Sequence, residues 1–321
     1  MLCGMDSARI QLLAARDARE LEGTARSLER AAIAEELARV RRGVYLGSET
    51  WRSLSDVERH AVQMDAARLV ARGEPVFSHE SAAVRLGIPV LGALPERVRV
   101  AVPPGRSRSS GAVQRLKRTL AEGEVVELDD GMRVTSPART AVELAASRSL
   151  LTGIIAISHV RNRFGTPVAE LAAVVRALGA SAGVPRARIA LERSSDGSES
   201  PLESLVVARC HDLGFALPEQ QVVVRGIDGA RYRIDFSWRE GRVLGEADGR
   251  AKYFDPAIRG RSEADEVLWR EKAREDAVRP LCERFLRVTW SDAWDGARLE
   301  RRLTAADVPR DRARRRRPLT F

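Results

Sequence analysis

The sequence is poor in cysteine, aromatic residues and long apolar runs, and each scarcity excludes a class of protein. Its cysteines, Cys3, Cys210 and Cys282, are far apart and lack Cys-x-x-Cys spacing, so neither a disulfide framework nor a zinc site is predicted. The most apolar stretch, residues 150–158, is far shorter than the roughly 18 residues of a membrane span. Charged residues near the start leave no apolar core for a signal peptide. We therefore expect a cytoplasmic protein without a membrane partner.

Lysine and asparagine are also scarce. Lysine supplies 3 of the 54 basic residues, and Asn162 is the sole asparagine. This bias is typical of a GC-rich coding sequence, so the abundance of arginine does not by itself indicate phosphate recognition. Of the net charge of +9, residues 301–321 contribute +6, because they hold eight Arg and two Asp. Most of the net charge therefore lies in the last 21 residues, and the basic tail within them, residues 304–321, either neutralises phosphates or is simply solvated.

The rest of the composition is that of a folded protein. Its 321 residues correspond to about two average domains, and 44% are hydrophobic and 31% charged. In residues 1–50, apolar residues at helical spacing are followed by a basic stretch around Gly43, which predicts a tight hairpin. Helices followed by a basic hairpin indicate a winged helix.

The middle of the chain, residues 51–193, alternates predicted helices and strands. A helix capped by Ser53 and a second helix over 78–86 precede strands at 98–102 and 125–128, and Pro137 opens a further helix. Residues 194–200 are polar and aperiodic, and we place a domain boundary there. The pattern predicts a central α/β domain.

The C-terminal region, residues 198–303, shows the order helix, three strands, helix, strand. The predicted ranges are 201–213, 220–225, 231–238, 242–247, 263–281 and 285–290. This order indicates a mixed sheet flanked by helices. We therefore expect an α/β fold (α+β overall) with three domains and a basic tail.

Acidic residues of this region fall where a sheet would gather them. Glu203 lies on the first helix, Asp235 lies within an apolar strand, and Glu246 and Asp248 end the next strand. A buried carboxylate costs several kcal/mol unless it has a cation, a metal ion or water as partner. Carboxylates at neighbouring strand ends suit Mg²⁺, which could activate water for attack on a phosphodiester.

These residues resemble a known superfamily. Ser200-Pro201-Leu202-Glu203, Arg233-Ile234-Asp235-Phe236 and Glu246-Ala247-Asp248-Gly249, with Lys252 beyond, are similar to the PD-(D/E)XK or restriction-endonuclease-like proteins, in the branch of the very-short-patch repair endonucleases. The resemblance covers about 198–300. It implies that Glu203, Asp235 and Glu246 are metal-site carboxylates, with Asp235 and Glu246 as Mg²⁺ ligands.

The chain departs from that superfamily pattern at one position. Asp248 stands where the pattern has lysine, and Lys252 is the residue that could supply the missing cation. Three interpretations of the C-terminal region stay open: an active nuclease, a binding module with an inactive nuclease fold, or carboxylates paired with Arg233, Arg250 or Arg274.

A second resemblance covers about residues 25–145. The segments Val40-Arg41-Arg42-Gly43-Val44-Tyr45, Phe77-Ser78-His79-Glu80-Ser81-Ala82-Ala83 and Val134-Thr135-Ser136-Pro137-Ala138-Arg139-Thr140 together resemble the AbiEi family of type IV antitoxins and related transcription regulators. This resemblance implies a winged helix that binds double-stranded operator DNA, and a toxin partner that is opposed without direct contact.

The expected DNA contacts are arginines. A recognition helix over 27–39 would present Arg30 and Arg39, and the wing would place Arg41 and Arg42 on phosphates. Residues 1–50 are net neutral, with eight Arg and eight acidic residues, so contact is restricted to one face. His79 is interpreted as a capping or packing residue, with a general base as the alternative.

Two functions follow as hypotheses. The first is a DNA-binding transcriptional regulator of the type IV antitoxin kind with an endonuclease-like C-terminal domain. The alternative is a Mg²⁺-dependent DNA endonuclease that its N-terminal domains direct to the target.

Overall fold

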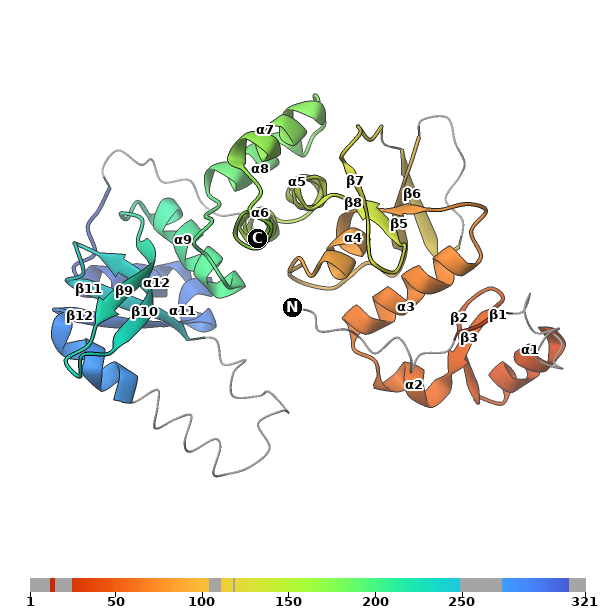
Figure 1. Cartoon of the computed structure of the whole chain (residues 1–321), viewed down its shortest axis with the longest axis horizontal. Helices are drawn as coiled ribbons and strands as arrows, with labels where there is room; N and C mark the ends of the chain where they lie inside the picture. Colours follow the sequence, from red (N-terminus) through yellow and green to blue (C-terminus); the bar gives the residue numbers. More distant parts are fainter. Residues whose placement is uncertain (1–11, 15–24, 104–110, 118, 249–272, 312–321) are drawn as a thin grey trace. The chain divides into compact units, whose positions relative to one another are not determined.

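The computed structural model describes residues 12–14, 25–103, 111–117, 119–248 and 273–311 (Figure 1). It has an α/β fold with helices and three sheets, as predicted. The chain divides into two compact units, residues 1–144 and 145–321. In the described part, no helix has both the length and the apolar character that crossing a membrane requires.

The first unit begins with a three-stranded sheet and one helix. Its elements are β1 (Leu13–Ala14), α1 (Ala25–Ile33), β2 (Leu37–Arg41) and β3 (Val44–Gly47). Strands β2 and β3 pair antiparallel around Gly43, whose φ of +76° suits a tight turn, so the predicted hairpin is confirmed.

Two expectations for this region are wrong. Leu13 lies in a strand that pairs with β3, although its spacing from neighbouring apolar residues predicted a helix. The predicted helix over 27–39 ends at Ile33, because Glu35 adopts a positive φ of 59° and the chain then enters β2. Arg39 is therefore a strand residue. The helical spacing before residue 12 lies outside the described residues.

Two helices then lead into the central sheet. Helix α2 (Ser48–Ser53) precedes α3 (Asp56–Leu69), and Ser55 caps α3 through a capping box with Glu58. The N-cap is thus Ser55 rather than Ser53, because Glu58 supplies the reciprocal carboxylate that closes the box. Helix α4 (His79–Leu86) ends at Gly87, which has φ +69°.

The central sheet is mixed and five-stranded, in the order β6-β5-β4-β8-β7. Its core is formed by buried residues of α3, α4 and the strands, among them Met64, Phe77 and Val134. The bounds are β4 (Val76–Phe77), β5 (Val98–Val102), β6 (Val113–Lys117), β7 (Val125–Glu127) and β8 (Arg133–Thr135).

The second unit begins within helix α5 (Pro137–Ser147). It continues with α6 (Leu150–Phe164), α7 (Val168–Ala177) and α8 (Val184–Glu192). Helix α6 is buried over residues 150–158 and at Val160, which is its apolar part, and its last turn is more exposed. The polar segment 194–200, expected as a domain boundary, lies inside this unit, because Arg161 of α6 donates to the Ser194 carbonyl at 2.6 Å and Ser195 N–H donates to Ser158 Oγ.

The C-terminal sheet has the order β12-β11-β10-β9. Strands β9, β10 and β11 pair antiparallel and β12 pairs parallel with β11, so the predicted mixed sheet and its strand sequence are confirmed. Residues 273–278 of the predicted 263–281 helix are helical, and 263–272 lie outside the described residues. The bounds are α9 (Pro201–Leu213), β9 (Glu219–Arg225), β10 (Arg231–Trp238), β11 (Val243–Asp248), η3 (Arg279–Leu281), β12 (Arg284–Thr289), α11 (Trp290–Trp294) and α12 (Gly296–Ala305).

Candidate functional site

The predicted carboxylates Glu203, Asp235 and Glu246, hereafter the carboxylate cluster, lie close enough to influence one another. Burial raises the pKa of Glu203, and the negative charge of Asp235 raises it further. Burial also raises the pKa of Glu246, where Arg274 opposes the effect and Asp235 adds to it. The fold thus gathers one residue from each of α9, β10 and β11.

Glu203 lies in the first turn of α9 and is only 5% exposed. Three donors hold its carboxylate: the Ser200 hydroxyl at 2.6 Å, the Glu199 N–H at 2.8 Å and the Gln221 side-chain amide at 2.9 Å. Ser200 is the N-cap of α9, because its Oγ accepts from the Glu203 N–H, and the same hydroxyl donates to the Glu203 carboxylate. Its position is set by local chain geometry.

Gln221 belongs to this site although the sequence analysis did not single it out. The flanking pairs Val222↔Ile234 and Gln220↔Phe236 place Gln221 opposite Asp235 across the sheet. Its φ is +55°, which a residue other than glycine rarely adopts inside a strand. The sequence signal for Gln221 was a polar side chain directly before three valines. Sequence periodicity does not reveal that the backbone of Gln221 has a positive φ.

The strand carboxylates have partners within the protein. Asp235 Oδ2 accepts the Ala247 N–H at 2.9 Å. Glu246 Oε1 lies 2.5 Å from Arg274 Nη2, which also donates to the Arg233 carbonyl at 2.6 Å. The pairing of Glu246 with Arg274 is one of the three interpretations left open by the sequence.

Asp248 also faces an arginine. Its Oδ2 lies 3.8 Å from Arg287 Nη1, and Arg287 Nη2 lies 2.9 Å from Glu275 Oε2. Asp248 therefore has a cationic neighbour on β12, in the next strand of the sheet. Lys252 and Arg250 lie outside the described residues.

The carboxylate cluster is engaged by protein groups. The described part of the chain holds no group of three or more His, Cys, Asp or Glu side chains arranged as a metal site. The carboxylates instead receive N–H and O–H donors or an arginine. As arranged here, the cluster is an ionic and hydrogen-bonded network.

We expect the Asp235→Asn variant to lower the pKa of both Glu203 and Glu246 toward 4.5, because it removes a neighbouring negative charge. Carbon-13 NMR titration of the glutamate carboxyls measures this change. A raised folded-state pKa stabilises the protein at low pH, and that contribution is lost as the pH rises through it. In the variant, the free energy of unfolding should therefore decrease less than in the wild type as the pH rises above 4.5.

Asp228→Asn removes the same charge from an exposed turn of the same sheet and serves as the control. Unchanged glutamate titrations in Asp235→Asn would show that the three carboxylates do not interact.

The predicted DNA-contacting arginines separate into two environments. Arg30 on α1, Arg39 on β2 and Arg42 in the turn are exposed. Arg41 is half-buried; its Nη1 is buried and has no hydrogen-bond partner among the described residues, and burial lowers its pKa. Arg41 therefore presents less of its guanidinium to a phosphate than Arg42 does.

The segment Ser78–Ser81 is part of a buried polar network. His79 is 4% exposed, has φ +53°, and its Nδ1 lies 3.2 Å from Glu143 Oε2. Arg139 Nε donates to the other oxygen of Glu143 at 2.9 Å, and its Nη1 donates to Glu124 at 3.1 Å. These contacts agree with the packing interpretation of His79.

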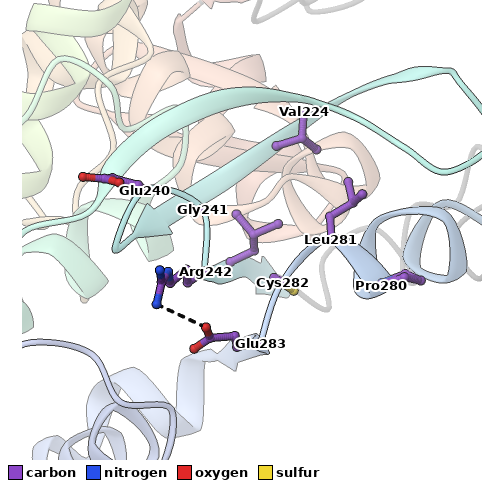
Figure 2. Close-up of a pocket in the computed structure, with 9 residues that line it drawn as sticks. Val224, Glu240, Gly241, Arg242, Pro280, Leu281, Cys282 and Glu283 are labelled. Carbon is purple, nitrogen blue, oxygen red and sulfur yellow. Dashed lines mark ion pairs between the residues drawn. The ribbon is translucent and has the colours of Figure 1, made fainter.

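A pocket of about 500 Å³ lies elsewhere on the C-terminal sheet, between the β10–β11 turn and the segment after the 273–278 helix (Figure 2). Arg242 and Glu283 form an ion pair at its rim, with 3.5 Å between Nη1 and Oε1. The pocket contains no member of the carboxylate cluster. Its apolar lining residues are Val224, Leu244, Pro280 and Leu281.

No family model matches the sequence. Over 127 residues, the chain is 28% identical to two uncharacterized proteins of Mycobacterium tuberculosis, MT2308 and Rv2248. The alignment covers 40% of this chain and 47% of each relative, so the chain spans about half the length of the curated relatives it matches. The crystal structure of the Rv2827c protein from Mycobacterium tuberculosis aligns with a TM-score of 0.40 and 11% identity, over 63% of this chain and 77% of that chain.

Proposed function

We propose that this protein is a DNA-binding transcriptional regulator of the type IV antitoxin kind, with an endonuclease-like C-terminal domain that serves as a scaffold. The observation that carries the proposal is the antiparallel β2–β3 hairpin, which follows α1 and exposes Arg39 and Arg42. A hairpin after a helix is the wing arrangement that places cations beside the DNA backbone. A toxin partner that it opposes without contact, and a cytoplasmic location, belong to the same proposal.

Acidic residues that precede the hairpin in the chain restrict which surface can contact DNA. Glu29, Glu35 and Glu36 are exposed near Arg30 and repel phosphate. Arg52 lies 3.7 Å from Glu35 and offsets part of that charge. The binding residues are therefore the exposed Arg39 and Arg42 of the hairpin, and the contacts they make are to phosphates.

The scaffold role of the C-terminal domain rests on the partners of its carboxylates. Glu246 is paired with Arg274, and Glu203 has three hydrogen-bond donors of its own. Groups engaged in this way link the sheet to the helices beside it. The nuclease hypothesis requires the same groups to face a metal ion.

We expect the Arg39→Ala/Arg42→Ala variant to bind double-stranded DNA about tenfold more weakly on all sequences, because two phosphate contacts are lost. Gel shifts at several salt concentrations measure the affinity, and the salt slope should fall by about 2.

The Arg72→Ala/Arg97→Ala variant is the matched control, because it removes the same charge from exposed positions of the same unit. If both double variants bind alike, the hairpin is not the DNA-binding element. Arg41 is left intact in both proteins, since its half-buried side chain would confound binding with folding.

A further inference from the structure

We propose that Arg274 is the resident cation of Glu246 in the carboxylate cluster and occupies the place that a divalent metal ion bound to this carboxylate would need. The proposal concerns the C-terminal sheet alone and does not depend on DNA binding by the hairpin.

The contacts of Arg274 carry the argument. One terminal nitrogen, Nη2, lies 2.5 Å from Glu246 Oε1 and 2.6 Å from the Arg233 carbonyl oxygen. A metal ion at this position would use the same two kinds of oxygen, carboxylate and carbonyl. The guanidinium thus satisfies a metal-like acceptor set with one positive charge.

The surroundings of Arg274 keep it in place. It belongs to the 273–278 helix, where Val278 is 1% exposed and packs with Ile234 and Leu244 of the sheet. On the same helix, Glu275 lies 2.9 Å from Arg287 of β12, so a second ion pair ties the helix to the sheet. The Glu246 side chain is 17% exposed and that of Arg274 36%, so the carboxylate is mostly shielded from water and the guanidinium is partly solvated.

The acidic neighbours of Glu246 favour a cation beside it. Glu246 has Asp235 and Glu275 as acidic neighbours, and Arg274 and Arg287 are the cations that offset them. A divalent ion at Glu246 Oε1 would compete with the Arg274 guanidinium, because two cations at one carboxylate oxygen repel each other. Arginine keeps its charge across the physiological pH range, so pH changes within this range do not vacate the position.

The experiment is Mn²⁺ binding to the full-length chain, followed by the electron paramagnetic resonance signal of free Mn²⁺. We expect the Arg274→Gln variant to bind Mn²⁺ about tenfold or more tightly than the wild type, because the competing charge is gone. The Arg274→Gln/Glu246→Gln double variant should lose that gain. Arg279→Gln, which breaks an exposed ion pair with Glu275 just after the same helix, should bind as the wild type does.

Two results would overturn the proposal. One is a wild-type protein that binds Mn²⁺ at a site abolished by Glu246→Gln, which would show that Arg274 does not occupy the metal position. This measurement needs no Arg274 variant, so it stands even if Arg274→Gln fails to fold. The other is a folded Arg274→Gln protein with no gain in Mn²⁺ affinity.

Discussion

The Glu143→Ala variant is expected to lose about 3–5 kcal/mol of the free energy of unfolding. Glu143 is 2% exposed and Arg139 is 3% exposed, and the two are joined at 2.9 Å. Removing the carboxylate takes one of two carboxylate partners, Glu143 and Glu124, from the buried Arg139 guanidinium, and removes the acceptor of the His79 N–H. Urea denaturation followed by circular dichroism measures the loss.

Two further variants test the cause of this loss. Glu143→Gln keeps an oxygen that can accept from Arg139 or His79 but has no charge, so its loss should be smaller. Glu127→Ala removes an exposed carboxylate from β7 and should cost less than about 0.5 kcal/mol. A loss below about 1 kcal/mol in Glu143→Ala would mean that the pair behaves like a solvent-exposed one.

The Gly183→Ala variant is expected to destabilise the second unit by about 1–3 kcal/mol or more. An added Cβ would overlap the Ala146 carbonyl oxygen and lie 2.7 Å from its carbonyl carbon and 2.9 Å from its Cα. The obstacle is backbone, which cannot rotate away as a flexible side chain can. Arg186 holds this backbone by donating to the Ala145 and Ala146 carbonyls at the end of α5.

The loss in Gly183→Ala comes from crowding and not from backbone strain. Gly183 has φ −85°, which alanine adopts freely. Gly47→Ala is the control, because its Cβ would lie 3.6 Å from Thr50 Oγ1 at φ −53°, and we expect a change within about 0.5 kcal/mol. Thermal unfolding compares the two proteins; equal midpoints would mean that α5 and α8 can separate without cost.

Local signals in the sequence were sufficient for much of the secondary structure. Pro201 and Gly214 bound α9 as a proline near its start and a left-handed glycine at its end, and Gly43 marks the hairpin turn. These features act over a few residues, so spacing alone predicts them. Leu13 was assigned wrongly because its pairing with Tyr45 on β3 overrides a helical spacing.

The candidate site depended on contacts that no local pattern encodes. Glu203, Asp235 and Glu246 were predicted as a group, since strand alternation and strand order place carboxylates near one another. That Glu246 bonds to Arg274, 28 residues later in the chain, depends on how the 273–278 helix packs on the sheet. The half-buried state of Arg41 is likewise a property of the folded sheet.

The sequence by itself determined the α/β class, the basic hairpin and the positions of the acidic residues along the strands, because each depends on residue type and short-range spacing. The tertiary structure decided which cation each carboxylate meets, which arginines face water, and that residues 145–193 join the second unit. These outcomes depend on contacts between residues far apart in the chain, where burial and charge are set only after the helices and strands have packed together.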